Sequence, residues 1–451
     1  MRTISKLITC ILFIFNVILY GSENTSEYNK NWPIWRGPLA TGEAPSGNPP
    51  IEWNENKNIR WKIPIAGKGL STPVTWNDQL FITTAVELKK IAESEKVKLQ
   101  KENRPLWLKL FGMSNTTENI QQYVIYSISR KSGKVLWKKV VREDLPHEGT
   151  HKDGSWASNS CVTDGEYVIA FFGSFGLFCF DLQGNLIWEK DLGDMKIIST
   201  FGEGSSPALY EDYVIINWDH EGASFIITLN KKTGDVIWEK ERDEGTTWST
   251  PLVVEVNGKP QVIVSASGHS RGYDLATGEI IWKLGGLTPG AIPSPVYSDG
   301  MIYLMSGFRG NALQAIKLDI AKGDLQQSPA IVWTHDENTP YVPSPLLYHG
   351  KLYFLNSNKE QLTCVDAKTG EIHYTKQKLK GIKGVYASPV GANGRVYVAG
   401  RNGVSYVIEA GPVYKMLAKN DLTDRFDSSP AIVGDELFLR GLKYLYCISA
   451  N

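Results

Sequence analysis

The stretch that decides the fold is GLFCFDLQGNLIW, which runs from Gly176 to Trp188. An apolar run ends at Asp181, a turn containing Gly184 follows, and a second apolar run leads to the tryptophan. The aspartate can hydrogen-bond the turn backbone, and the glycine can adopt the positive φ that such a turn requires. The pattern therefore predicts two short strands joined by a tight turn. Closely similar segments, NKKTGDVIW and DLATGEIIW, end at Trp238 and Trp282, so the hairpin is a repeat.

A second marker gives the period of this repeat. It is a small hydroxyl residue followed by proline, and it occurs at Thr72-Pro73, Ser206-Pro207, Thr250-Pro251, Ser294-Pro295, Ser344-Pro345, Ser388-Pro389 and Ser429-Pro430, with Asn159-Ser160 in the slot after the first. From Pro207 onward, the steps between the prolines are 44, 44, 50, 44 and 41 residues. An apolar strand follows each marker. This period is typical of propeller blades, and the proline suits the start of an innermost strand, where a missing donor is tolerated.

The two ends of the chain predict how the ring closes. The last unit reaches Asn451 without a fourth strand, while residues 59–63, IRWKI, form an outer strand with no blade before it. Pairing the two removes two open sheet edges. We therefore predict an all-β fold, an eight-bladed β-propeller of four-stranded blades in which an N-terminal strand completes the last blade. A seven-bladed ring is the alternative if Asn159-Ser160 is not a marker, but the hairpin that ends at Trp188 argues against it.

The chain before the ring begins with the features of an export signal. Arg2 and Lys6 provide positive charge, residues 7–20 are mostly apolar, and small residues follow at 21 and 22. The alternative is an uncleaved membrane anchor, for which the apolar run is short. Lipid attachment is not expected, because Cys10 lies in the middle of the run. The predicted organisation is a signal peptide over 1–22, an N-terminal extension over 23–57 and the propeller over 58–451, with an insertion in the first blade over 86–121.

The charged part of that insertion, ELKKIAESEKVKLQKENR, predicts a solvated helix, and a partner-binding segment is the alternative. Over the whole chain, 48 basic residues balance 48 acidic ones. A nucleic-acid-binding protein normally has a basic surplus, so we expect no nucleic-acid partner. Cys179, Cys364 and Cys447 occupy the same repeat position on three blades, which predicts buried core residues without disulfides.

Functional residues are expected where the loops of the ring converge. In a four-stranded blade, the loop between strands two and three shares one face with the loop that enters strand one, and together these loops surround the mouth of the central channel. The predicted ligand-binding residues at this mouth are His151, Trp156, Asp219, His220, Trp248, Arg309, Tyr341 and Arg401; the same loops carry Glu221, His269, Arg271, Lys359, Tyr386 and Arg440. Arginine, histidine and aromatic side chains suit an anionic or sugar-like ligand. The alternative is that the arginines cap strand ends and face water.

The chain has no catalytic motif of the GxSxG, P-loop or GxGxxG type. The segment HEGTH at 147–151 matches HExxH in residue types. That zinc motif requires a helix to place both histidines on one face, and Pro146 and Gly149 oppose a helix. We therefore predict neither a catalytic residue nor a metal ligand.

Four segments resemble the PQQ-binding-like propeller family of bacterial envelope proteins, a group similar to BamB: WPIWRGP at 32–38, IRWKIPIAGKGLSTPV at 59–74, the repeat that ends at Trp188, and YVPSPLLYHGKLYF at 341–354. The resemblance covers about Trp32 to Asn451. It implies an exported protein, periplasmic or associated with the cell envelope, with no membrane span after signal cleavage. It also implies a non-catalytic binding scaffold for a protein or carbohydrate partner, without a cofactor.

The alternative is a PQQ-dependent oxidoreductase, because quinoprotein dehydrogenases share the repeat. A resemblance to those enzymes implies that pyrroloquinoline quinone binds at the channel mouth together with calcium. It also implies an aspartate base and a disulfide between adjacent cysteines beside the quinone. This chain has no adjacent cysteine pair and no C-x-x-C-H haem site. Asp219 and Glu221 are the carboxylates that would supply calcium ligands under this alternative.

Overall fold

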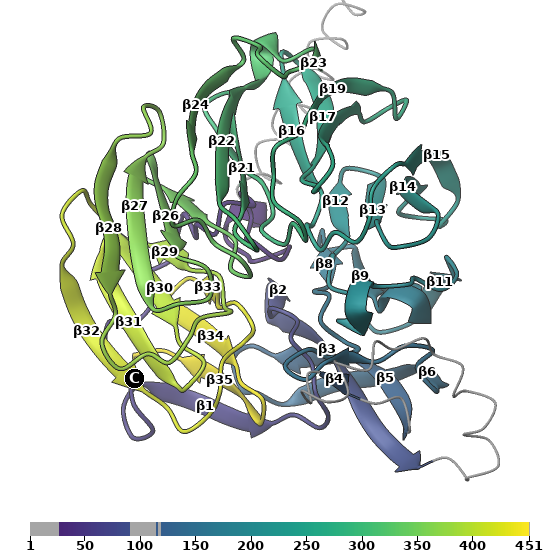
Figure 1. Cartoon of the computed structure of the whole chain (residues 1–451). Coiled ribbons are helices and arrows are strands. Elements are labelled where there is room, and N and C mark those ends of the chain that lie inside the picture. Colours follow the sequence, from purple (N-terminus) through teal and green to yellow (C-terminus); the bar gives the residue numbers. More distant parts are fainter. Residues whose placement is uncertain (1–26, 91–113, 116–118, 451) are drawn as a thin grey trace, which may run out of the picture.

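The computed structural model describes residues 27–90, 114–115 and 119–450. Eight antiparallel sheets stand around a central channel and form a closed ring, as predicted (Figure 1). The predicted signal peptide and residues 91–104 of the charged helix expected in the insertion lie outside the described residues. Residues 87–90, with which that helix was expected to begin, instead continue a β-strand (Gln79–Lys90), so the helix prediction is wrong at its start. None of the helices that the structure describes is long and apolar enough to cross a membrane.

The first four blades follow the chain order, from the channel outward. Their strands are β2 (Val74–Trp76), β3 (Gln79–Lys90), β5 (Asn119–Ser129) and β6 (Val135–Asp144) in blade 1; β8 (Val162–Thr163), β9 (Tyr167–Phe171), β10 (Leu177–Asp181) and β11 (Leu186–Lys190) in blade 2; β12 (Ala208–Tyr210), β13 (Tyr213–Trp218), β14 (Ser224–Asn230) and β15 (Val236–Arg242) in blade 3; and β16 (Leu252–Val256), β17 (Lys259–Val264), β18 (Ser270–Asp274) and β19 (Ile280–Leu284) in blade 4.

The second half of the ring repeats the pattern. Its strands are β20 (Val296–Ser298), β21 (Met301–Ser306), β22 (Ala312–Lys317) and β24 (Ile331–His335) in blade 5; β25 (Leu346–Tyr348), β26 (Lys351–Leu355), β27 (Gln361–Asp366) and β28 (Ile372–Lys378) in blade 6; β29 (Val390–Ala392), β30 (Arg395–Ala399), β31 (Val404–Glu409) and β32 (Met416–Asp421) in blade 7; and β33 (Ala431–Val433), β34 (Glu436–Arg440), β35 (Tyr444–Ile448) and β1 (Ile59–Pro64) in blade 8. Outside this pattern, β23 (Gly323–Asp324) extends blade 4, and β4 (Ser114–Asn115) pairs with β7 (Thr150–His151).

The closure is the one that the chain ends predicted. Strand β1 pairs antiparallel with β35, with Trp61 opposite Cys447 and Ile63 opposite Leu445. The unit that contains Asn159-Ser160 forms a complete four-stranded sheet, so the ring has eight blades. The cysteines at the shared repeat position are buried and free, as expected.

The hydroxyl of each marker has a structural role that the sequence did not reveal. Each backbone N–H of a marker donates to the hydroxyl of the next marker, which forms a chain of bonds around the channel: Thr72 to Ser160, Ser160 to Ser206, Ser206 to Thr250, Thr250 to Ser294, Ser294 to Ser344, Ser344 to Ser388 and Ser388 to Ser429, each 2.9–3.0 Å long. The hydroxyl of Thr72 accepts no such bond within the described residues. At that seam, Arg440 of blade 8 instead donates to Ser71 Oγ (3.1 Å) and Thr83 O (2.7 Å) of blade 1.

The outer-strand tryptophans hold neighbouring blades together. The indole N–H of Trp188 in blade 2 donates to Lys231 O in the turn of blade 3, at 2.7 Å. The ring also lies against Gly234 of that turn, where an added Cβ would stand 2.8 Å from the indole. Trp137 and Trp238 make the same bond to the next blade, at 2.9 and 2.7 Å. The turn glycine is therefore needed for its positive φ and for the close approach of the ring.

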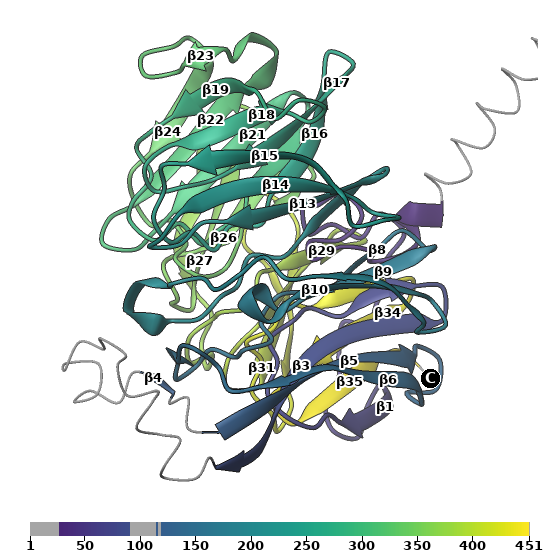
Figure 2. The ribbon, with the colours of Figure 1, turned by 90° about the vertical axis from the view of Figure 1, so that its right-hand side faces the viewer.

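The N-terminal extension lies across one end of the channel. Trp32 is fully buried there, and the backbone of the segment bonds to the inner strands of blades 1, 2, 6 and 7 before it continues into β1. We call this end the opposite face and the end with the loops between strands two and three the mouth face. Figure 2 shows the start of the described chain on one side of the ring and β4 with the end of β3 on the other.

Candidate functional site

Two arginines and two aspartates form a closed network at the mouth face. Asp153 comes from the loop between blades 1 and 2, and the other three residues come from blade 7 and the loop that enters blade 8. Arg401 contacts Asp153 at 3.0 Å and Asp427 at 2.7 Å. Arg425 contacts the same two carboxylates at 2.7 and 2.6 Å. The network joins segments that are 272 residues apart and satisfies both arginines within the chain.

Burial and ring stacking set the electrostatics of this network. Desolvation raises the pKa of the Asp427 carboxyl to about 6, although Arg401 opposes that change. The Arg401 guanidinium lies 3.7 Å from the centre of the Tyr386 ring. The arginine therefore has partners on its edge and on its face, which is the arrangement of a fixed structural cation.

Partly exposed aromatic rings lie on the mouth face over blades 3 to 6. Phe308 and Tyr341 stack with their centroids 4.8 Å apart, and the Arg309 guanidinium lies 5.1 Å from the Phe308 ring. Trp248 is fixed by its indole N–H, which donates to Gly202 O at 2.7 Å. Arg309 is exposed, and it makes no ion pair with any described residue. Arg309, Tyr341 and Trp248 are the predicted residues that the structure brings to an accessible surface together.

Asp219 and His220 lie apart from that surface, inside blade 3. The Asp219 carboxylate accepts two bonds from Arg242, at 2.6 and 3.0 Å, and both side chains are 0% exposed. Arg242 also donates to the Tyr273 hydroxyl. His220 Nδ1 accepts from the Lys196 backbone at 2.8 Å, and its Nε2 lies 3.0 Å from Ala223 O. Their polar atoms are thus bonded inside the blade rather than presented to a ligand.

The HEGTH segment is not helical, as the proline and glycine predicted. Residues 145–149 are irregular, and Thr150–His151 forms β7. His147 Nε2 bonds Met195 O at 2.8 Å, while His151 Nδ1 accepts from the Asp153 backbone at 3.2 Å. Within residues 27–90, 114–115 and 119–450, no three histidine, cysteine or carboxylate side chains form a group that could hold a metal ion.

A carboxylate that the sequence did not single out lies beside this segment. Glu203 accepts bonds from the backbone and the hydroxyl of Ser174, at 2.8 and 2.6 Å. Desolvation nevertheless raises its pKa to about 7. His147, Glu148 and Trp156 line the same small space, whose volume is only about 10 Å³. The Trp156 indole donates to Glu148 O at 3.1 Å, so this predicted residue closes the space and supports the loop.

Sequence reasoning missed Asp153, Glu203, Arg425 and Asp427. Asp427 lies two residues before the last marker, so its place in an entry loop was readable from the repeat. Its partners were not readable, because they come from other blades and from the loop before blade 2. Arg440, which was grouped with the mouth loops, ends β34 and is buried against blade 1.

The carboxylates proposed for calcium under the oxidoreductase alternative do not fit that ion. Both oxygens of Asp219 hold Arg242. Glu221 Oε1 accepts from the backbone and the hydroxyl of Thr246, at 3.0 and 2.8 Å. Calcium needs six to eight oxygen ligands, and these two carboxylates are already committed within the chain.

The comparisons with known proteins agree with the architecture. No curated protein sequence matches the chain. Among solved structures, BamB from Moraxella catarrhalis matches with a TM-score of 0.50 and 12% identity, over 72% of this chain and 91% of that chain. The computationally designed Ika8 protein matches with a TM-score of 0.51 and 10% identity, over 74% of this chain and 95% of that chain. Europium-containing methanol dehydrogenase has a TM-score of 0.47 and 12% identity, over 92% of this chain and 90% of that chain.

At these identities, the matches to BamB and to the Ika8 protein show the fold alone. The family model described as "Outer membrane protein assembly factor BamB" matches residues 121–372 and 285–448 of the chain. These two segments run from β5 of the first blade to β35 of the last, so the match follows the repeat around most of the ring. The chain therefore belongs to this family of PQQ-repeat β-propellers.

Proposed function

We propose that this protein is a non-catalytic scaffold of the bacterial cell envelope whose mouth face binds a protein partner. The observation that carries the proposal is the pairing of the charged groups at the mouth. Arg401 and Arg425 hold Asp153 and Asp427, and Glu244 holds Arg271 at 2.7 Å. Side chains that hold one another in this way form a rigid surface rather than a set of free acids and bases.

The groups that remain accessible at the mouth favour a protein partner. Trp248, Phe308, Tyr341 and the exposed Arg309 belong to residue types that are enriched at the centres of protein interfaces. A carbohydrate partner would also stack on aromatic rings. The family supports the protein partner, because its description names an assembly factor for outer membrane proteins. The envelope location rests on the same family and on the export signal predicted over residues 1–22.

The interface is tested by placing a photoreactive benzoylphenylalanine at position 309 and irradiating living cells. We expect one discrete cross-linked protein, which disappears when Phe308 and Tyr341 are also replaced with alanine. The matched control is the same residue at Val332, which is exposed on β24 of the same blade. Equal cross-linking at both positions, or none at 309, would contradict the proposed interface.

The oxidoreductase alternative is tested with the purified protein and pyrroloquinoline quinone in the presence of calcium. We expect the absorption spectrum of the quinone to stay that of the free compound over the titration. We also expect no dye reduction with alcohols or sugars as substrates. Turnover that depends on both quinone and calcium would show that the protein is an enzyme and would contradict the proposed scaffold function.

A further inference from the structure

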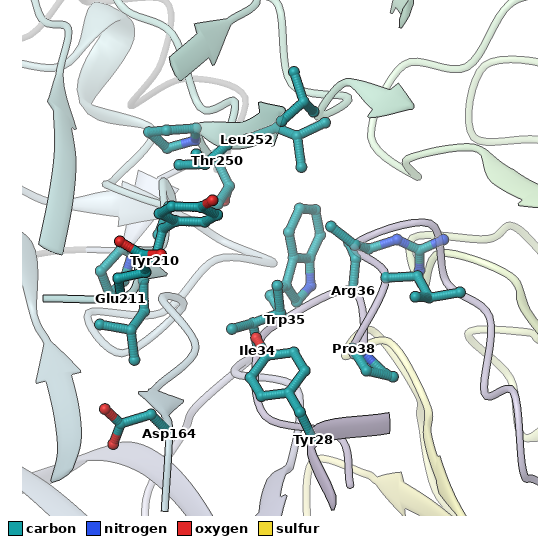
Figure 3. Close-up of a pocket in the computed structure, with 18 of the residues that line it drawn as sticks. Tyr28, Ile34, Trp35, Arg36, Pro38, Asp164, Tyr210, Glu211, Thr250 and Leu252 are labelled. Atoms are coloured by element: carbon teal, nitrogen blue, oxygen red, sulfur yellow. The ribbon is translucent and has the colours of Figure 1, made fainter. Parts of the chain in front are cut away.

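A large cavity of the described chain lies on the opposite face, lined by the N-terminal extension and not by the mouth loops. It encloses about 820 Å³ between the N-terminal extension and the inner strands of blades 2 to 5. Trp35 projects into it, with Tyr28 and Ile34 beside it and Tyr210 and Leu252 across the space (Figure 3). The guanidinium of Arg36 bonds Pro345 O and Pro389 O, each at 2.9 Å. The wall that the extension supplies is therefore anchored to blades 6 and 7.

The extension itself shows how a peptide binds to this end of the ring. In four blades, an inner-strand residue two or three positions after the marker donates its N–H to the extension. Thr75 and Thr163 donate to the consecutive carbonyls of Trp32 and Pro33, and Leu347 and Gly391 donate to those of Thr41 and Gly42, at 2.9–3.1 Å. At each of these two places, two consecutive carbonyls of the extension accept from two consecutive blades.

The same backbone position is unused in blades 3, 4 and 5. Leu209 and Tyr297 pair with their second strands in the register of Leu347, so their N–H groups face the channel in the same way. Val253 holds the corresponding place in β16. All three line the cavity, and their channel-facing N–H groups have no acceptor within the part of the chain that the structure describes. Three neighbouring donors are therefore available for the carbonyls of another extended segment.

The charges and the apolar side chains that line the cavity indicate which side chains the bound segment would need. Glu166, Glu211 and Glu255 are exposed at the edge of the cavity, and none of them forms an ion pair with a described residue. Of the two cations in the lining, Lys231 is paired with Asp164 at 2.6 Å, and Arg36 is buried and bonds backbone carbonyls. Trp35 and Leu252 provide apolar wall between these acidic groups. The free charge at the edge is thus negative, and the interior favours aromatic or aliphatic side chains.

We propose that this cavity binds an extended segment of a partner polypeptide in which aromatic or aliphatic residues are flanked by lysine or arginine. The carbonyls of the segment accept from Leu209, Val253 and Tyr297, and its basic residues face Glu211 and Glu255. The segment continues across blades 3 to 5 the path that the extension follows across blades 1, 2, 6 and 7. This site is separate from the mouth and does not depend on the function proposed for it.

The test measures the fluorescence anisotropy of a short labelled peptide in which lysine alternates with tryptophan or leucine. The reference peptide has glutamate in place of lysine. We expect the basic peptide to bind the purified protein saturably, and the acidic one not to bind. Binding of both peptides, or of neither, would overturn the proposal.

Variants assign the binding to the cavity. Val253→Pro removes one donor at a strand edge where proline is tolerated, and it should weaken binding about tenfold. Glu211→Gln with Glu255→Gln should weaken it roughly fivefold in low salt. Glu239→Gln, on the exposed outer strand of blade 3, is the matched control and should change nothing. Arg309→Ala should also change nothing, which separates this site from the mouth. Equal affinity of all variants would place the peptide elsewhere and overturn the proposal.

Discussion

At the scale of single residues, the marker hydroxyls do more than start a strand. Seven of the eight accept a backbone N–H from the neighbouring blade, and these seven bonds join the eight inner strands. Both serine and threonine occur in this position, because either residue supplies the hydroxyl. The sequence marked these positions by their period, but a periodic hydroxyl gives no sign of the donor that it accepts.

The hydroxyl of Thr250 is predicted to stabilise the fold more than that of Thr72. Thr250→Val keeps the volume of the side chain but leaves the Ser206 N–H without its acceptor, which lies at 3.0 Å. The free energy of unfolding should fall by about 1–3 kcal/mol. Thr72→Val is the matched control, because the Thr72 hydroxyl accepts nothing in the described chain. Urea denaturation of both variants measures the difference, and equal losses would contradict the role of the bond.

At the scale of elements, five of the described blade junctions are formed by a tryptophan of one blade that covers a glycine turn of the next. The pattern GLFCFDLQGNLIW contains both parts, but they contact different blades: Trp188 covers Gly234, and Gly184 is covered by Trp137. The hairpin could be predicted from sequence because its turn chemistry is local. Which ring lies on which turn follows only when the blades are placed side by side.

Gly234 is predicted to be constrained twice, by its backbone and by the tryptophan above it. Its φ is +74°, and an added Cβ would lie 2.8 Å from Trp188. Gly258 has a φ of +75° with no atom within 4 Å of that position, so it isolates the backbone effect. Gly258→Ala should cost about 1 kcal/mol, and Gly234→Ala should cost a further 1–3 kcal/mol through the clash. Thermal unfolding followed by circular dichroism checks this, and equal melting temperatures would show that the ring moves aside without cost.

At the scale of the whole molecule, the ring is held closed by β1, a strand from the opposite end of the chain. Trp61 in this strand lies 5.9 Å from Phe438 and donates its indole N–H to Arg130 O at 2.8 Å. It therefore joins blade 8 to blade 1. The isolated IRWKI segment predicted this closure because a single outer strand without a blade has only one place to pair.

Trp61→Ala is predicted to open the ring as well as to remove packing. Trp188→Ala is the matched control, because the two tryptophans occupy the same repeat position and are 9% and 8% exposed. Both variants should lose about 3–5 kcal/mol of unfolding free energy. Only the Trp61 variant should become sensitive to limited proteolysis within β1, because no hairpin turn joins β1 to its partner β35, whereas β11 is joined to β10 by a tight turn. Mass spectrometry of the fragments gives the cleavage sites, and the same pattern from both variants would contradict the special role of the closure.

The residues of the candidate sites were harder to predict from the sequence than the fold was. The structure places Trp248, Arg309, Tyr341 and Arg401 in the loops where the repeat positions put them. The repeat could not separate the exposed Arg309 from Arg401, since the latter is paired with Asp153 from a distant loop. The ligand that binds at the mouth stays a prediction.

The sequence by itself determined the period, the number of blades and the way the ring closes. Those properties depend on short-range chemistry, namely turn residues, strand alternation and a marker that repeats along the chain. Only the tertiary structure decided which charged groups are free and which are paired, because pairing joins segments up to 272 residues apart. It also decided that the N-terminal extension covers the inner strands of some blades and leaves a cavity over the others. That choice depends on where the extended backbone finds donors, which no local pattern records.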